Sequence, residues 1–330
     1  MGDLLKKKKQ PTVLGVNLVY LCVLLLMVVA QLLLTNFLPQ ASQGAGEYWK
    51  LFFLELLLIG GPPLVYMIFS KMDIGEVARF NRLRPTEIIL VIGMAIFGFF
   101  VTIIINLLWY WVASHWGSPA GQELPAIENG LQFLVAVLVI GLVPALVEEF
   151  LFRGLILRGY EKFGSKIAIV VTGILFGMLH LQLMSIPSII LIGVVMSYVV
   201  YRTNSILAGI IYHFLHNTIA VAILYMQNVL MKTQGAVEGL PQDLSQLPDD
   251  MLMVVFVVWG IIGFLALILF VSCIVVFHKY TQGRGHIRER SEKELGRSNF
   301  FEMLPALIAL AIVVINLIYE LLYMTGFISI

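Results

Sequence analysis

The sequence predicts an all-α fold, a polytopic bundle of about nine transmembrane helices. Of its 330 residues, 60% are hydrophobic and only 12% are charged, and the mean hydropathy is +0.94. Soluble domains carry about 25% charged residues, so this chain has too little charge to cover a surface that faces water. The same hydrophobicity excludes disorder, and the net charge of +1 offers no basic surface for nucleic acid. The lipid bilayer is therefore the expected environment.

Nine apolar segments account for this prediction. A spanning helix needs about 20 predominantly apolar residues. The segments that meet or approach this length are 13–38, 51–70, 87–113, 131–152, 167–185, 187–201, 206–228, 251–278 and 300–326. The first is longer than the roughly 7–15 apolar residues of a cleavable signal peptide, which predicts an uncleaved span. The sixth is short and begins at Pro187, so the bundle has eight spans if this segment does not cross.

The basic residues lie almost entirely in every second connection. With nine spans, 19 of the 21 lysines and arginines fall on one side of the membrane, and only Lys50 and Lys232 fall on the other. Because cytoplasmic loops are enriched in lysine and arginine, we expect a multi-pass protein of the cell membrane with a cytoplasmic N-terminus and an external C-terminus. An error of one internal span would move every later loop to the other side and destroy this separation.

Three of the predicted spans carry polar groups at membrane depth, where a charged side chain costs about 2.5–3.5 kcal/mol on insertion scales. This cost makes embedded polar residues candidates for function. The candidates are Glu148, Glu149 and Arg153 in the fourth span, His180 in the fifth, and His213, His216 and Asn217 in the seventh.

Helical geometry predicts different roles for the two adjacent glutamates. Successive residues are about 100° apart on a helix, so Glu148 and Glu149 point in different directions. Arg153 is four residues after Glu149 and within pairing reach, whereas it is about 140° away from Glu148. We therefore expect a Glu149–Arg153 pair and a Glu148 without a counter-ion on its own helix. Depths counted along the helices permit one shared cavity open towards the cytoplasm.

The candidates form three motifs in a fixed order on separate helices. They are E-E-x-x-x-R (Glu148, Glu149, Arg153), F-x-x-x-H (Phe176, His180) and H-x-x-x-N (His213, Asn217). This set resembles the CAAX prenyl protease and bacteriocin-processing family of intramembrane peptidases, also called Abi or CPBP, over about residues 130–225.

The resemblance implies roles for these residues in the hydrolysis of a peptide bond. Glu148 would activate a water molecule with the help of His180. His213 and Asn217 would hold the water or stabilise the oxyanion, and Glu149 and Arg153 would order the site. The expected partner is a membrane-associated peptide or protein substrate.

We expect three regions along the chain. Residues 1–128 contain the first three spans, residues 129–228 form the core that resembles this family, and residues 229–330 contain an external loop and the last two spans. Nothing is carried over from the resemblance to the first and third regions.

A zinc site is the alternative to a cofactor-free site. Glu148, His180 and His213 could supply a His2Glu ligand set, but no H-E-x-x-H motif is present and the implied roles need no metal. The two cysteines, Cys22 and Cys273, lie in apolar runs and predict neither a disulfide framework nor a zinc knuckle. The expectation is a site without a cofactor.

Two other functions remain open. A catalytically silent scaffold or bacteriocin self-immunity protein could use the same fold to bind another membrane protein. A proton-coupled transporter also uses embedded glutamate and histidine, although no paired interrupted spans in matching halves are visible.

Some polar residues have simpler interpretations. His216 is predicted to pack or to support the site from outside. Glu55 and Glu320 are predicted to lie at the external ends of their spans.

Overall fold

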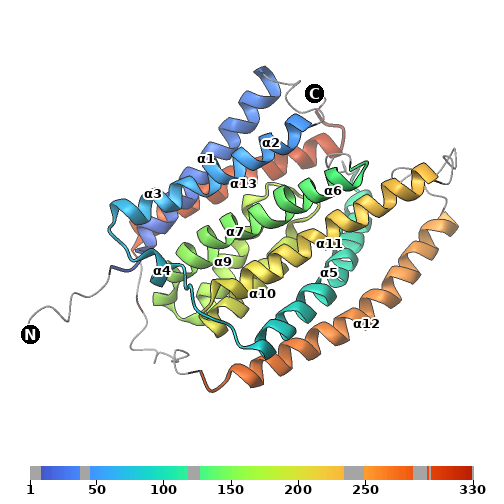
Figure 1. Cartoon of the computed structure of the whole chain (residues 1–330). Coiled ribbons are helices and arrows are strands. Elements are labelled where there is room, and N and C mark those ends of the chain that lie inside the picture. The colour runs from blue at the N-terminus through green and yellow to red at the C-terminus, as the bar shows by residue number, and fades with distance from the viewer. Residues whose placement is uncertain are drawn as a thin grey trace, which may run out of the picture.

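The computed structural model describes residues 9–37, 45–117, 127–233, 249–284, 296 and 299–328. These residues form helices and no strands, as the sequence predicts (Figure 1). Seven basic residues used to predict the orientation lie outside the described residues: Lys6, Lys7, Lys8, Arg288, Arg290, Lys293 and Arg297.

Eight helical segments are long and apolar enough to cross a membrane. They are Val13–Leu34, Gly46–Phe69, Pro85–Ser114, Gly130–Phe163, Ile186–Thr203, Ile206–Leu230, Asp250–Thr281 and Phe300–Met324. A ninth apolar helix, Ser165–Leu179, is shorter. The chain is thus a polytopic helical bundle, and its short helix is the fifth rather than the sixth.

The elements follow one another in a simple order along the chain. They are α1 (Val13–Phe37), α2 (Ala45–Phe53), η2 (Leu54–Ile59), α3 (Gly61–Phe69), α4 (Ile74–Val77), α5 (Pro85–Ser114), α6 (Gly130–Ala136), η3 (Val137–Leu142), α7 (Val143–Glu149), η4 (Phe150–Ile156), α8 (Leu157–Tyr160), η5 (Glu161–Phe163), α9 (Ser165–Leu179), α10 (Ile186–Thr203), α11 (Ile206–Thr233), α12 (Asp249–Thr281) and α13 (Phe300–Met324). The elements η2, η3 and η4 are π-helical turns.

The predicted fifth span, 167–185, is wrong at its end. Helix α9 stops at Leu179 because Leu181 has a left-handed backbone conformation with φ 53°, which a right-handed helix cannot continue. A turn then leads to α10, which carries Pro187 in its first turn, where the missing N–H of proline has no helical partner to lose.

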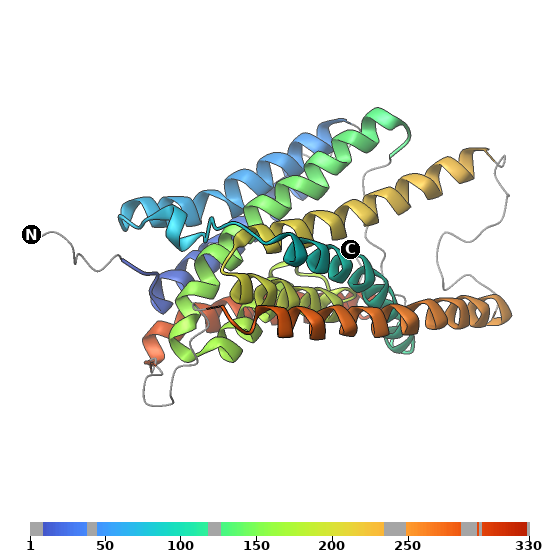
Figure 2. The ribbon, with the colours of Figure 1, turned by 60° about the horizontal axis from the view of Figure 1, so that its bottom comes forward.

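The middle of the chain lies at the centre of the bundle and the terminal spans lie beside it. Helix α13 packs along α1, and α12 packs along α5 at one edge of the bundle in both views (Figures 1 and 2). Helices α7, α9, α10 and α11 lie between these two pairs. The candidate residues from the three motifs lie in α7, η4, α9 and α11, and His180 comes directly after the last residue of α9.

Small residues let α9 and α10 approach backbone to backbone. A Cβ atom added to Gly173 would lie 2.6 Å from the backbone nitrogen of Val194, and one added to Gly193 would lie 2.8 Å from the carbonyl oxygen of Gly173. Any larger side chain at these positions would push the helices apart, which is the packing that small residues allow in membrane bundles. This contact fixes the helix that ends beside His180.

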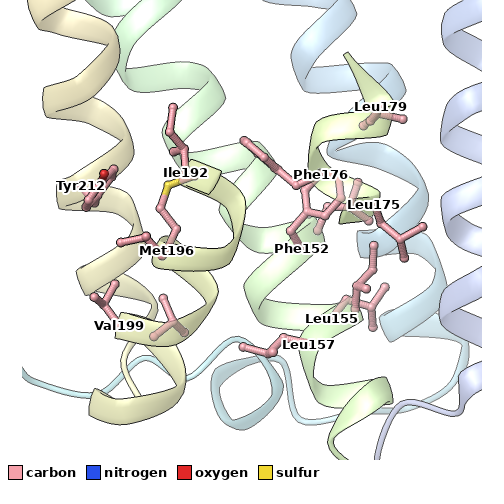
Figure 3. Close-up of a cluster of buried hydrophobic side chains, with 14 of the residues drawn as sticks. Phe152, Leu155, Leu157, Leu175, Phe176, Leu179, Ile192, Met196, Val199 and Tyr212 are labelled. Atoms are coloured by element: carbon pink, nitrogen blue, oxygen red, sulfur yellow. The ribbon is translucent and has the colours of Figure 1, made fainter. Parts of the chain in front are cut away.

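An apolar core includes Phe176 from the second motif. Figure 3 shows its side chains, which come from η4, α8, α9, α10 and α11. The labelled members are Phe152, Leu155, Leu157, Leu175, Phe176, Leu179, Ile192, Met196, Val199 and Tyr212. All of them are buried, so the site is built on a packed support.

Candidate active site

A proline interrupts the fourth span just before the two glutamates. Pro144 lies in the first turn of α7 and has no N–H, so it cannot donate to the carbonyl oxygen of Ile140, four residues earlier. The side chain of Asn217 on α11 supplies the missing donor, with Nδ2 3.1 Å from that oxygen. The interruption therefore ties α11 to the helix that carries Glu148 and Glu149.

Glu149 and Arg153 form the pair that the sequence predicts. Nη1 of Arg153 lies 2.5 Å from Oε1 of Glu149, and both side chains are fully buried. Nη2 of Arg153 donates to the carbonyl oxygen of Gly193 at 2.9 Å, and the guanidinium lies 4.5 Å from the ring centre of Phe176. Arg153 thus joins the fourth span to both α9 and α10.

His213 faces the same carboxylate. Its Nδ1 lies 3.3 Å from Oε1 of Glu149. Gly209, one turn earlier on α11, leaves the room that this carboxylate needs, since an added Cβ there would lie 2.1 Å from Oε2 of Glu149. Glu149 therefore contacts both a guanidinium and an imidazole.

Glu148 has no such partners. It is only 6% exposed, and its buried Oε2 atom accepts no hydrogen bond from any residue that the structure describes. Arg153 makes its ion pair with Glu149 instead. The chain thus keeps a buried carboxylate oxygen free of hydrogen bonds beside an ordered, charged network.

His180 and His213 both contact the ring of Phe176. The ring centres of His180 and His213 are 5.0 Å and 5.7 Å from that of Phe176, and the two histidines interact electrostatically. Nδ1 of His180 lies 2.9 Å from the carbonyl oxygen of Phe176. Because a carbonyl oxygen only accepts, this contact puts the proton of the neutral ring on Nδ1 and leaves Nε2 as an acceptor.

A third glutamate belongs to this neighbourhood and was missed by the sequence analysis. Glu55 interacts electrostatically with Glu148 and His213, and its Oε2 atom is buried without a hydrogen bond from any described residue. The element η2 that carries it packs on α7, where a Cβ added to Gly60 would lie 3.1 Å from Val147.

The sequence-based prediction that Glu55 lies at the external end of its span is wrong. Glu55 is nine residues from Gly46 and fourteen from Phe69 in the candidate span, or about 14 Å and 21 Å at roughly 1.5 Å per residue. The cost of an embedded charge that identified the other candidates was also a signal for this residue.

His216 packs among aromatic rings, as expected. Its ring stacks on Tyr212 with centres 6.3 Å apart and meets the edge of Phe99 at 5.1 Å. It also interacts electrostatically with His213, so it lies next to the candidate residues.

The described side chains give no support to the alternative zinc site. Among the described residues, no group of three or more histidine, cysteine, aspartate or glutamate side chains could hold a metal ion.

The comparison with protein families matches the central part of the chain. The family model described as Type II CAAX prenyl endopeptidase Rce1-like matches residues 130–219. This range runs from the start of α6 into α11 and contains all three motifs, so the match supports the resemblance that the motifs predict. Comparisons with curated proteins and with solved structures give no match.

Proposed function

We propose that this multi-pass membrane protein, whose residues 130–219 match the Rce1-like family, is an intramembrane endopeptidase that cleaves a membrane-associated peptide or protein. At the level of the family, the match supports a CAAX-type intramembrane peptidase. The observation that carries the proposal is Glu148, a buried carboxylate with an unpartnered oxygen next to the Glu149–Arg153 pair. Glu149 is held at Oε1 by Arg153 and His213, whereas Glu148 forms no ion pair with a described residue, so Glu148 is the candidate of the two for acting on a water molecule.

Glu148 is the general base of the proposed reaction. Its carboxylate accepts a proton from a water molecule, and the water oxygen attacks the carbonyl carbon of the scissile peptide bond. When the C–N bond breaks, the carboxylic acid returns this proton to the leaving nitrogen, which regenerates the carboxylate.

His180, His213 and Asn217 orient the reactants. With its proton on Nδ1, His180 presents Nε2 as an acceptor for the second O–H of the attacking water. Asn217 donates one amide N–H to Ile140 and keeps the other for the developing oxyanion. His213, held at Nδ1 by Glu149, directs its other ring nitrogen away from that carboxylate.

Glu149 and Arg153 hold these groups in place. Their pair neutralises itself in a buried position, and its contacts with Gly193 and His213 connect the fourth span to α10 and α11. We assign them an ordering role and no part in proton transfer.

The test compares membranes of cells that carry the wild type, Glu148→Gln or His180→Ala by quantitative peptide profiling. Glu128→Gln is the matched control, because Glu128 is an exposed glutamate just before the same span. A peptide that disappears in both site variants but persists in the control identifies a product. Unchanged profiles in all variants, with biological activity kept by Glu148→Gln, would instead favour the scaffold.

We further propose that the N-terminus is cytoplasmic and the C-terminus external, on the strength of the separation of basic residues. This parity requires α9 to count as a crossing. Labelling of Lys9→Cys and Thr325→Cys in intact cells with a membrane-impermeant maleimide tests it, and labelling of Lys9→Cys would contradict it.

A further inference from the structure

The turn that follows His180 has a backbone conformation that side chains disfavour. Leu181 has φ 53°, in the left-handed region where the Cβ atom of an ordinary residue is crowded. Such a conformation persists only where surrounding contacts hold it. His180 is the residue directly before it and caps α9 with φ −72° and ψ −15°, so the turn sets the backbone from which the His180 ring projects.

Three side chains from other helices hold this turn. Nε1 of Trp109 on α5 donates to the carbonyl oxygen of Leu183 at 2.9 Å. Nδ2 of Asn316 on α13 donates to the carbonyl oxygen of Leu181 at 3.1 Å. The N–H of Leu183 donates to Oε2 of Glu320 on α13 at 2.7 Å.

The two contacts from α13 come from one face of that helix. Asn316 and Glu320 are four residues apart, which places them one above the other on a helix. Both Leu181 and Leu183 are thus held from α13, and Leu183 is held from α5 as well. Trp109, Asn316 and Glu320 all lie outside residues 130–219, so parts of the chain beyond the family match reach the turn after His180.

We propose that Asn316 and Glu320, with Trp109, are positioning residues that fix the orientation of His180. The C-terminal span then serves as a brace for the central helices. Glu320, predicted from the sequence to be interfacial, has a specific partner in this brace. The inference rests on the proposed function, since it gives His180 an orientation that the peptidase uses.

The test uses the purified full-length chain in lipid nanodiscs and two substitutions at one position. Glu320→Leu removes the acceptor for the Leu183 N–H, whereas Glu320→Gln keeps a carbonyl oxygen there. The matched control is Glu302→Gln, which removes the charge of the ion pair with Lys162, at 2.9 Å near the other end of α13. Asn316→Leu breaks the second contact and replaces Glu320→Leu if that variant does not fold.

The first readout needs no substrate. Carbethoxylation of His180 by diethyl pyrocarbonate, followed by mass spectrometry, reports how well the ring is held. We expect faster modification in Glu320→Leu and Asn316→Leu, and the wild-type rate in Glu320→Gln and Glu302→Gln. Equal rates of His180 modification in all variants would refute the positioning role of Asn316 and Glu320.

The second readout is cleavage of a peptide identified by the membrane profiling. Because small displacements of a reacting group cost up to about 100-fold in rate, we expect kcat to fall about 10- to 100-fold in Glu320→Leu while KM stays near the wild-type value. If kcat is normal in this variant while Glu148→Gln is inactive, the positioning role of Glu320 is refuted and the proposed peptidase activity is retained. If neither the wild type nor any variant cleaves the peptide, but the rate of His180 modification still depends on the residue at position 320, the positioning role is supported and the proposed peptidase activity is refuted.

Discussion

His213 and Glu149 face each other from different helices, with Nδ1 of the histidine 3.3 Å from Oε1 of the glutamate. The same carboxylate oxygen receives Nη1 of Arg153. The second glutamate of the pair is therefore engaged by two partners, while Oε2 of Glu148 has none among the described residues. Oε2 of Glu149 also accepts no hydrogen bond from a described residue, so the two glutamates differ in the contacts that Arg153 and His213 make with Oε1 of Glu149. This difference separates their expected effects on activity and on stability.

Glu148→Gln is expected to remove activity without weakening the fold. The amide cannot accept a proton from water, and loss of a general base costs about 10²–10⁴-fold in rate. The substitution breaks no described hydrogen bond at Oε2, so the thermal midpoint should stay at or above the wild-type value. Cleavage assays and thermal unfolding in the same detergent check this, and a variant with normal turnover would contradict the role of Glu148 as a base.

Glu149→Gln is expected to destabilise the fold. It leaves the fully buried guanidinium of Arg153 without its counter-ion, and breaking a buried pair from one side costs about 3–5 kcal/mol. Chemical unfolding in mixed micelles measures this loss. The double variant Glu149→Gln/Arg153→Met should recover part of it, because the uncompensated charge is then gone. A double variant less stable than the single one would contradict the pairing.

Glu55→Gln is expected to reduce turnover even though Glu55 lies outside the matched segment. Its carboxyl group interacts electrostatically with Glu148 and His213, so its replacement by an amide changes the electrostatic environment of the proposed base. Glu47→Gln, a change of the same type near the start of the same span, is the control. Equal kcat in both variants would show that Glu55 has no influence on the site.

Much of this arrangement could be predicted from the sequence, because it follows from spacing along single helices. The lengths of the apolar segments predict the helical bundle, and the four-residue separation of Glu149 and Arg153 predicts their ion pair. The contacts of Glu149 with His213 and of Glu320 with Leu183 could not be predicted, because they join residues 64 and 137 positions apart. Such contacts depend on which helices become neighbours.

The end of α9 shows the same limit. Apolar residues continue past Leu179 and favour a longer helix, but the side chains of Asn316 and Trp109 hold a turn there. A tertiary contact therefore decides a boundary that local hydrophobicity leaves open.

Gly209→Ala is expected to disturb Glu149 through space alone. The added Cβ would lie 2.1 Å from Oε2 of Glu149 and 2.9 Å from Val200, so the carboxylate must move away from its partners. Overpacking of this kind costs about 1–3 kcal/mol, and displacement of Glu149 should also lower turnover. Gly260→Ala on α12 is the matched control, since an added Cβ there has nothing within 4 Å. Equal thermal midpoints for the two variants would contradict the close approach of α11 to Glu149.

The link between Pro144 and Asn217 is testable by restoring the donor that proline lacks. Asn217→Leu leaves the carbonyl oxygen of Ile140 without the hydrogen bond it receives at 3.1 Å, and the loss of a typical hydrogen bond costs about 0.5–1.5 kcal/mol. Adding Pro144→Ala to that variant supplies an N–H in the same helix, which should bond to Ile140 and return part of the lost stability. Activity should not return, because the alanine N–H replaces only the structural bond and not the second amide N–H proposed for the oxyanion. Thermal unfolding and cleavage measured on the single and double variants separate these two effects, and recovery of turnover in the double variant would remove Asn217 from the proposed chemistry.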